Sequence, residues 1–330
     1  QEKNGCARRL YVRQNRGNYF GMKDAFSRTI DYMRVSLTDR CNYRCVYCMD
    51  ECGVEKKSHD DILSFEDVMT IIRAFHNLGG KKVRFTGGEP LLRKNAADLI
   101  CSVKKELPDL CIGLTTNGVY LPKYIDKLSD CIDGLNVSID SLSDEIYNKI
   151  TRGGNLECAI QGISAAKNSG IKNIKVNAVL MKGVNDDVSA FSEFAKKHDV
   201  KVRFIEMMPI MNEHAFHKYF LPADIFVKEN DMKFLRRENK VDVYMTKDGV
   251  EIGVIAALQS KFCSSCNRIR LTADGKILPC LHHDVFVDVK PYLADGNVED
   301  AILKAVEIKP REHLIEKGVL QKINMYGIGG

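Results

Sequence analysis

Short apolar runs alternate with amphipathic segments between residues 30 and 206. The runs are rich in Val and Ile and end in Gly, Asp, Asn or Thr, which is typical of β-strands. We expect strands over 32–37, 82–86, 111–116, 134–139, 174–180 and 201–206. The segments between them carry apolar residues at helical spacing. We expect helices over 65–78, 95–106, 121–129, 143–150, 156–169 and 187–197.

A strand-then-helix unit repeated six times predicts a parallel sheet with helices packed against it. Closed parallel barrels of the TIM type use eight such units. The fold class is therefore α/β, and we expect a partial, open (β/α)6 TIM-like barrel. We assign residues 22–240 to this barrel and its connecting region.

The pattern changes after residue 206. The stretch 207–240 carries Pro209, Pro222 and scattered charges, and we expect it to be a loop region. An Asp-Gly pair then separates the two runs of each of two expected β-hairpins: 241–247 with 250–257, and 268–272 with 276–281. With a helix expected over 298–306, we assign 241–330 to a small antiparallel C-terminal domain that lies across the mouth of the barrel.

Composition and charge exclude two classes of protein. No stretch approaches about 18 consecutive apolar residues, and no apolar signal-peptide core stands near the start, so we expect no membrane partner. The net charge of +5 is uneven, because residues 1–21 carry five basic side chains against Glu2. The rest of the chain is nearly neutral and lacks the broad basic surface of a nucleic-acid-binding protein, so we expect no nucleic-acid partner.

The chain begins with Gln1 rather than Met, and Met22 is a candidate start. We expect residues 1–21 to be a basic N-terminal extension, either disordered or added with the cloned sequence, and we leave it out of the fold prediction. Such a basic head also has the composition of a mitochondrial transit remnant. The expected location is the cytoplasm, or the mitochondrial matrix if the head is such a remnant.

Twelve cysteines are the most unusual feature of the composition. Close spacing without a signal peptide favours reduced, metal-binding cysteines over disulfides. Cys41, Cys45 and Cys48 form a CxxxCxxC motif after the first expected strand, at the strand end where parallel barrels carry their active sites. Three thiolates can hold a cubane iron–sulfur cluster and leave one iron open for a ligand. Zinc is the alternative, with Cys52 as its fourth ligand.

A second group of cysteines lies in the C-terminal hairpin region. Cys263, Cys266 and Cys280 form a CxxC motif followed, after thirteen residues, by a third cysteine. They again leave one ligand position open, and zinc completed by His282 or His283 is the alternative. Four further cysteines stand in apolar contexts, and we expect them to be small core residues: Cys101, Cys111, Cys131 and Cys158.

The first motif, with Tyr47 before its last cysteine, resembles the signature of the radical S-adenosylmethionine (SAM) superfamily. Gly87-Gly88-Glu89-Pro90, after the second expected strand, matches the GGEP motif of that superfamily. The resemblance implies a [4Fe–4S] cluster whose open iron binds the amino and carboxylate groups of SAM, with residues 87–90 at the ammonium and Tyr47 by the adenine. Glu89 can supply a counter-charge near the sulfonium. One electron would cleave SAM to methionine and a 5′-deoxyadenosyl radical.

The stretch 263–281 closely resembles the GTP 3′,8-cyclase family, which begins molybdenum cofactor (molybdopterin) biosynthesis, and the resemblance extends over 22–330. It implies a second [4Fe–4S] cluster on the three C-terminal cysteines, whose open iron binds the guanine of GTP. The implied lyase reaction abstracts the ribose 3′ hydrogen, joins C3′ to guanine C8 and yields 3′,8-cyclo-7,8-dihydro-GTP.

The resemblance also implies roles for single residues. The expected GTP contacts are Arg34, Arg84, Thr115, Lys175, Arg268 and Arg270, and the expected SAM contacts are Tyr47, Gly88, Ser138 and Met208. The expected catalytic residues are Arg268, Arg270 and the terminal Gly329-Gly330. The two glycines are included because the tail of the family is thought to reach into the active site. Two observations stand without the resemblance. Arg268 and Arg270 share one strand face and suit a polyphosphate, and Arg84 and Lys175 are charges in apolar strands that need a partner.

The family also suggests partners for the chain. We expect GTP as substrate, a homodimer, an electron donor such as flavodoxin or ferredoxin, and transfer of the product to a cyclic pyranopterin monophosphate synthase of the MoaC type. Two other functions stay open. One is a peptide-modifying radical SAM enzyme with an auxiliary cluster, and the other is a non-catalytic zinc protein that binds nucleotide or RNA.

Overall fold

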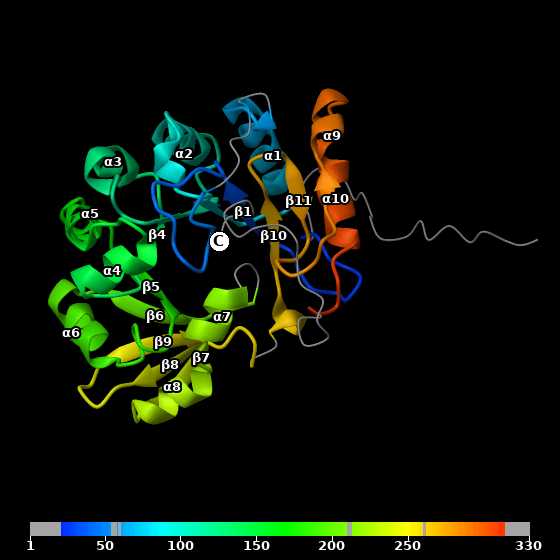
Figure 1. The fold of residues 1–330 in the computed structure, drawn as a ribbon. Helices are drawn as coiled ribbons and strands as arrows, with labels where there is room; N and C mark the ends of the chain where they lie inside the picture. The colour runs from blue at the N-terminus through cyan, green and yellow to red at the C-terminus, as the bar shows by residue number, and fades with distance from the viewer. Residues whose placement is uncertain (1–20, 54–57, 59–60, 210–212, 260–261, 314–330) are drawn as a thin grey trace, which may run out of the picture.

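The computed structural model describes residues 21–53, 58, 61–209, 213–259 and 262–313 (Figure 1). Residues 1–20 of the expected extension lie outside the described residues, and so do Gly329 and Gly330. In the described part of the chain, no helix is long and apolar enough to cross a bilayer.

Six parallel strands form the centre of the sheet, and the helices between them line its outer side (Figure 1). The strands are β1 (Tyr32–Ser36), β2 (Lys82–Thr86), β3 (Cys111–Thr116), β4 (Gly134–Ser138), β5 (Ile174–Leu180) and β6 (Lys201–Glu206). The helices are α1 (Phe65–Asn77), α2 (Ala96–Glu106), α3 (Leu121–Leu128), α4 (Asp144–Thr151), α5 (Leu156–Asn168) and α6 (Ser189–His198). Each strand pairs in parallel with the next, which confirms the predicted α/β class and every predicted element in this region.

The two predicted hairpins extend this sheet at opposite edges. β8 (Val241–Met245) and β9 (Glu251–Ile255) are antiparallel to each other, and β9 lies parallel to β6. β10 (Arg268–Leu271) and β11 (Lys276–Leu278) are also antiparallel to each other, and β10 lies parallel to β1. The result is one 12-stranded sheet in the order β12-β11-β10-β1-β2-β3-β4-β5-β6-β9-β8-β7. An open barrel would leave the edges of β1 and β6 without hydrogen-bond partners, and the hairpins supply them.

The stretch 207–240 is not a loop region, so that prediction was wrong. It contains α7 (Glu213–Tyr219), α8 (Ala223–Glu229) and β7 (Lys233–Glu238), which pairs with β8 at the edge of the sheet. Pro222 stands at the amino-terminal cap of α8. A proline is tolerated at this end of a helix because its missing N–H would have no partner within the helix.

Three short elements complete the chain that the structure describes. β12 (Val287–Asp288) pairs with β11, and α9 (Lys290–Ala294) leads to α10 (Val298–Glu307), which confirms the helix expected there. α10 packs against α1, and its buried residues include Ile302 and Val306. The segment after α10 contacts the hairpin of β10 and β11, because Lys309 donates to the carbonyls of Arg268 and Pro279.

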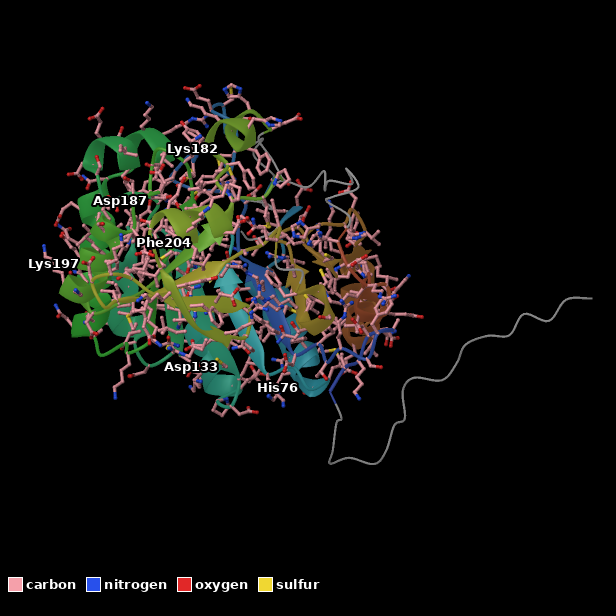
Figure 2. The ribbon with its side chains drawn as sticks, turned by 90° about the horizontal axis from the view of Figure 1, so that it is seen from below. His76, Asp133, Lys182, Asp187, Lys197 and Phe204 are labelled. Atoms are coloured by element: carbon pink, nitrogen blue, oxygen red, sulfur yellow. A yellow bond between two sulfur atoms is a disulfide. The ribbon has the colours of Figure 1, made fainter. Side chains whose placement is uncertain are left out.

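The two faces of the central strands differ in chemistry. On β1, Met33 and Val35 are completely buried, whereas Tyr32 and Arg34 point to the other face. Phe204 of β6 shows how the outer face is packed, because its ring contacts rings of α6 and α8 in the interior of the molecule (Figure 2). The strand registers place the following polar residues on the same inner face as Arg34: Arg84, Thr115, Asn136, Lys175 and Arg203.

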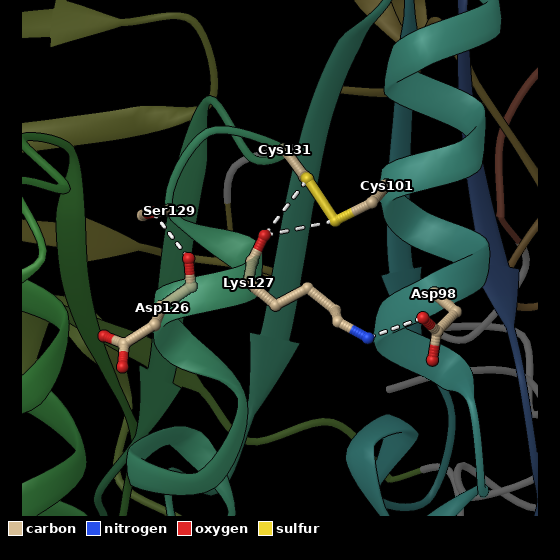
Figure 3. Close-up of a disulfide and its surroundings, with 6 residues drawn as sticks. All are labelled: Asp98, Cys101, Asp126, Lys127, Ser129 and Cys131. Atoms are coloured by element: carbon tan, nitrogen blue, oxygen red, sulfur yellow. Dashed lines mark hydrogen bonds and ion pairs between the residues drawn. A yellow bond between two sulfur atoms is a disulfide. The ribbon is translucent and has the colours of Figure 1, made fainter.

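Cys101 and Cys131 form a disulfide that joins α2 to the turn after α3 (Figure 3). Their Cα atoms lie 5.0 Å apart and both side chains are only partly buried. The prediction of small reduced core residues was therefore wrong for this pair. Beside the disulfide, Lys127 forms an ion pair of 2.6 Å with Asp98 and so joins the same two helices (Figure 3). Cys111 keeps a free thiol.

Candidate active site

The first cysteine motif forms a loop at the carboxyl end of β1. The loop is held on the end of α4 by two backbone hydrogen bonds: the Arg44 amide donates to Thr151 at 3.0 Å, and the Val46 amide donates to Ile150 at 2.9 Å. These bonds fix the stretch of backbone between Cys41 and Cys48. The three thiols therefore belong to one loop whose path is set by a neighbouring helix.

Arg152 closes this loop from the other side. It ends α4 in the left-handed backbone conformation, with φ of 53°. Its Nη1 donates to the carbonyl of Arg44 at 3.1 Å and to the carbonyl of Met49 at 2.9 Å. One guanidinium therefore joins the residues that flank Cys45 and Cys48.

The glycines of the GGEP motif lie directly against the segment that leads into the first cysteine. The Gly88 amide donates to the Thr38 carbonyl at 2.7 Å, and the Glu89 amide donates to the Arg40 carbonyl at 2.8 Å. A Cβ on Gly88 would collide with the Arg40 carbonyl, and a Cβ on Gly87 would lie 2.6 Å from the Thr38 carbonyl. Only residues without side chains permit this approach of the two loops.

Glu89 anchors the same loop to the end of β3. One carboxylate oxygen accepts hydrogen bonds from the Thr116 hydroxyl at 2.8 Å and the Leu91 amide at 3.1 Å, and the other accepts from the Asn117 amide at 2.8 Å. Burial raises the pKa of Glu89 to about 7. Pro90 begins a short 3₁₀ helix. The described contacts of Glu89 are thus with protein donors, whereas the sequence suggested a counter-charge for the cofactor.

Tyr47 is oriented by a buried carboxylate. Its hydroxyl donates to Asp140 at 2.8 Å, and the second oxygen of Asp140 accepts from the Val179 amide of β5 at 2.8 Å. Burial raises the pKa of Asp140 to about 6. Four of the predicted cofactor residues lie at or after the carboxyl ends of different strands: Tyr47, Gly88, Ser138 and Met208. Parallel pairing brings these strand ends to the same edge of the sheet.

Burial keeps the thiols of this loop protonated. It raises the pKa of Cys41 to about 11 and that of Cys48 to about 12, and the neighbouring thiol of Cys41 opposes ionisation of Cys48 further. Thiolates here need a strong positive partner, which iron supplies. Among the described residues, no three His, Cys, Asp or Glu side chains converge on one point as a single metal ion requires. Three cysteine thiolates are the donor set of a four-iron cluster that keeps one iron open, so the residues of this loop fit such a cluster. Cys52 is exposed.

Cationic side chains line the inner face of the sheet. Arg34 of β1 lies between Arg270 of β10 and Arg84 of β2 in the strand registers, so three guanidiniums form one row across neighbouring strands. Arg84 and Arg270 are 8% and 6% exposed. We call the following set the cationic inner face: Arg34, Lys82, Arg84, Lys175, Arg203, Arg268 and Arg270.

These cations are held together against their mutual repulsion. Burial and then Arg270 hold the pKa of Arg34 well below its usual range. Burial and Arg268 lower the pKa of Arg270 to about 10, and burial and Arg203 lower that of Lys175 to about 8. Gathering desolvated positive charges costs free energy that a polyanionic ligand would recover. The inner face therefore has the electrostatics of a polyphosphate site.

Tyr32 lies within this set and was missed in the sequence. Its hydroxyl accepts a hydrogen bond from Arg84 Nε at 3.1 Å, and Arg268 and Lys82 lie over its ring at 5.4 and 5.3 Å. Burial opposes ionisation of Tyr32, but Arg84 and Arg34 outweigh it and help lower the pKa to about 8. Arg84 also donates to the Leu114 carbonyl at 2.8 Å and lies 3.4 Å from Thr115.

Lys82 and Arg203 were also missed, although a signal for Lys82 was present. Lys82 stands two residues before Arg84 and Tyr32 two before Arg34, so strand periodicity puts each on the same face as a predicted ligand residue. Arg203 faces Asn177 on the neighbouring strand. Extending the pattern by two residues from Arg84 would have found Lys82, whereas Arg203 stands on a strand without a predicted ligand residue.

The second cysteine motif lies at the opposite end of the strands from the first. Cys266 precedes β10 by two residues and Cys280 follows β11 by two. Because β10 is parallel to β1, Cys266 stands at the amino end of the sheet, where the Tyr32 amide donates to the Asn267 carbonyl at 3.2 Å. Parallel pairing with β1 therefore places Cys266 and Cys280, at the two open ends of the hairpin, at the amino end of the sheet, whereas the Asp274-Gly275 turn of the hairpin lies at the carboxyl end.

The thiols of the second motif meet a different electrostatic environment. Burial raises the pKa of Cys280, whereas at Cys266 burial is outweighed by Lys309 and Lys240, which lower the pKa to about 7. His282 donates its amide to the Cys280 sulfur at 3.5 Å. Cations of the protein thus favour a thiolate at this site, which suits cluster or metal binding equally.

Comparisons with known proteins agree with this geometry. The model of the radical SAM superfamily matches residues 35–195, and that described as Molybdenum Cofactor Synthesis C matches 200–315. The GTP 3′,8-cyclase of Clostridium botulinum (strain Hall) is 40% identical over 321 residues, covering 94% of this chain and 100% of that protein. The GTP 3′,8-cyclase of Petrotoga mobilis is 41% identical over 330 residues with the same coverage.

A solved structure shares the fold. SuiB of Streptococcus suis, bound to precursor peptide SuiA, superimposes with a TM-score of 0.61 at 14% identity. The match covers 86% of this chain and 65% of SuiB. At this identity the likeness concerns the fold alone.

Proposed function

Because the chain belongs to the radical SAM superfamily and, within it, to the GTP 3′,8-cyclase family, we propose that it is a lyase that converts GTP to 3′,8-cyclo-7,8-dihydro-GTP, in the first step of molybdenum cofactor biosynthesis. The superfamily implies a [4Fe–4S] cluster and SAM, which supply the one-electron cleavage of SAM when bound. The cluster ligands would be Cys41, Cys45 and Cys48, and the SAM contacts would be Tyr47, Gly88, Ser138, Met208 and the backbone of residues 87–90.

The cationic inner face is the observation that supports GTP as the substrate. It brings buried guanidiniums into one row, and paired guanidiniums bind phosphate oxygens through directed hydrogen bonds. Arg34, Arg84 and Arg270 would bind and neutralise the triphosphate, and Lys175 and Arg268 would join them. Held in this way, the ribose presents its 3′ C–H in a fixed orientation, which is the main contribution of the protein to such a reaction.

The two cysteine sites at opposite ends of β1 support a two-ended arrangement. SAM would bind at the carboxyl end, and a second [4Fe–4S] cluster on Cys263, Cys266 and Cys280 would bind the guanine at the amino end. A GTP molecule between them would lie along the cationic inner face. The terminal Gly329 and Gly330 would reach this site as part of the catalytic set.

Anaerobic reconstitution with iron and sulfide tests the proposal. We expect about eight irons per chain, as two cubanes require, and formation of 5′-deoxyadenosine that rises with GTP and consumes it. The measurement is chromatography of deoxyadenosine and GTP after addition of SAM and a strong reductant. SAM cleavage that is indifferent to GTP would contradict the substrate assignment.

Arg268→Ala and Arg270→Ala test the phosphate role directly. Each should weaken GTP binding by at least about tenfold, which is about 1.4 kcal/mol, and leave the iron content unchanged. Arg73→Ala is the matched control, because Arg73 forms an exposed ion pair of 2.6 Å with Glu106 on the outer helices. Unchanged GTP affinity in both inner-face variants would refute the role.

A peptide-modifying radical SAM enzyme with an auxiliary cluster is the second candidate, which the sequence left open. The row of buried cations disfavours it, because a peptide backbone is not a polyanion. Incubation of the reconstituted enzyme with GTP and with peptides separates the two. A binding protein that uses zinc would give stoichiometric zinc and no SAM cleavage.

Partners follow from the proposed reaction. The chain would act as a homodimer, take electrons from a donor such as flavodoxin or ferredoxin, and pass its product to a cyclic pyranopterin monophosphate synthase of the MoaC type. Light scattering tests the dimer, and coupled turnover with each purified partner tests the other two.

A further inference from the structure

The second cysteine site is assembled from segments that lie far apart in the chain. Cys263 and Cys266 precede β10 and Cys280 follows β11. Residues just after α10 contact both of these segments, and Arg28, just before β1, contacts the segment of Cys263. Neither of these two flanking segments contains a cysteine of the motif. Buried cations make the connections.

Lys309 joins β10 and the end of β11, next to Cys266 and Cys280. It is only 3% exposed. Its ammonium donates to the Arg268 carbonyl at 2.8 Å and to the carbonyl of Pro279, the residue next to Cys280. Both partners are neutral carbonyls, and no carboxylate ion pair of Lys309 occurs in the described part of the chain. The ammonium therefore brings a positive charge to the protein wall of the site.

Arg28 holds the third cysteine. Its Nη1 donates to the Cys263 carbonyl at 2.7 Å and to the Arg311 carbonyl at 2.9 Å, and its Nη2 donates to the Pro310 carbonyl at 2.6 Å. Its Nε forms a buried ion pair of 2.5 Å with Asp24. Asp24 compensates the charge of Arg28, so this residue contributes geometry rather than net charge.

We propose that Arg28 and Lys309 are positioning residues of the second cysteine site, and that the charge of Lys309 favours the reduced state of the cluster bound there. The inference rests on the proposed function, because that function requires the second cluster. Each cation ties a cysteine segment to residues 309–311, so the three ligands reach one place only when the chain after α10 is docked. A positive charge close to a cluster stabilises the added electron.

Two variants of Lys309 separate charge from shape. Lys309→Met keeps the length of the side chain and removes its charge and its hydrogen-bond donors. Lys309→Arg keeps the charge and the donors. We measure iron per chain and the reduction of each cluster by redox titration with electron paramagnetic resonance, without GTP turnover. In Lys309→Met we expect the ratio of reduced to oxidised second cluster at a fixed potential to fall at least about tenfold, or about 59 mV for one electron. In Lys309→Arg it should stay within about twofold.

Loss of the second cluster in Lys309→Met supports the inference equally, provided that Lys309→Arg retains it. Wild-type iron content and potential in Lys309→Met would overturn it, and so would equal defects in both variants. Four irons in the wild type would overturn the second cluster and this inference together. Eight irons and GTP consumption in the wild type, with no effect in Lys309→Met, would overturn the inference alone.

Arg28→Lys completes the set, because it keeps the charge and loses the forked geometry. We expect it to bind iron at the second site more weakly than wild type and to keep the potential of the cluster it retains. Unfolding of the iron-free variants by heat gives the readout for folding. An Arg28→Lys protein with full iron content after dialysis against a chelator would show that Arg28 does not position Cys263.

Discussion

The two cysteine sites of this protein differ in how they are built. The first occupies one loop of eight residues, held by α4 and Arg152 at the carboxyl end of β1. The second lies at the amino end and is gathered from distant segments by Arg28 and Lys309. The surroundings of their thiols differ as well. Burial raises the pKa of Cys48 to about 12, whereas lysines lower that of Cys266 to about 7. A local motif can rely on its metal for positive charge, whereas a dispersed site uses protein cations that also connect its parts.

Removing one cysteine ligand from each site should give the largest effect and show that the two sites have different functions. Cys45→Ala should lose about four irons and all deoxyadenosine formation, because the cluster that serves SAM is gone. Cys266→Ala should lose the other four, retain SAM cleavage and lose GTP consumption. Iron analysis and chromatography of both products check this. Equal loss of SAM cleavage in the two variants would remove the functional distinction between the sites.

Removing Arg152 should damage only the first site. Arg152→Met loses the two side-chain hydrogen bonds of Arg152 to the loop, at the carbonyls of Arg44 and Met49. We expect retention of the first cluster against a chelator to weaken by about 10- to 100-fold, as for outer partners of metal ligands. The second cluster should be unchanged, and this can be read from its own paramagnetic signal.

Arg152→Gly is a useful companion variant, because it allows the left-handed backbone at this position without the guanidinium. A defect as large as that of Arg152→Met would assign the effect to the lost hydrogen bonds. Full chelator resistance in both variants would show that α4 alone holds the loop.

The pH dependence of thiol labelling should sharpen the electrostatic difference. In iron-free protein, Cys266 has a lowered pKa of about 7, so its thiolate is present above that pH and disappears as the pH falls through it. Cys41 and Cys48, with pKa values raised to about 11 and 12, stay protonated across the same range. Alkylation at pH 8 followed by mass spectrometry should label Cys266 first, and its rate should fall by about tenfold for each pH unit well below 7. Equal rates at the three cysteines would contradict the difference.

The smallest expected effect on either site comes from the disulfide. Replacing Cys101 and Cys131 together by Ser should lower the free energy of unfolding by about 2 to 4 kcal/mol under oxidising conditions. The disulfide lies among the helices on the outer side of the sheet, so iron content and SAM cleavage should not change (Figure 1). Cys158→Ala is the control, because its thiol is free. A change in iron content or in SAM cleavage would show that the outer helices are coupled to the cysteine sites.

The sequence predicted the central fold well because its signals are local. Strand and helix periodicities from β1 to β6 depend on neighbours along the chain, and the first cysteine motif, the CxxC pair of the second and the GGEP motif are short stretches of sequence. The region around Pro222 was misread because a proline at the start of a helix and a proline in a loop look alike locally. The resemblance to the GTP 3′,8-cyclase family was confirmed by the relatives that share about 40% identity over nearly the whole chain.

What only the tertiary structure decided depends on pairing between distant segments. The Asp-Gly turns predict the hairpins, but not that β9 joins β6 and β10 joins β1 in parallel. The second pairing places Cys266 at the amino end of the sheet. Arg28 and Lys309 carried no signal, because a lone cation in a sequence shows neither its burial nor the carbonyls that it will meet. Local patterns thus determined the elements and the ligand types, and long-range strand pairing determined where the second site lies and which cations hold it together.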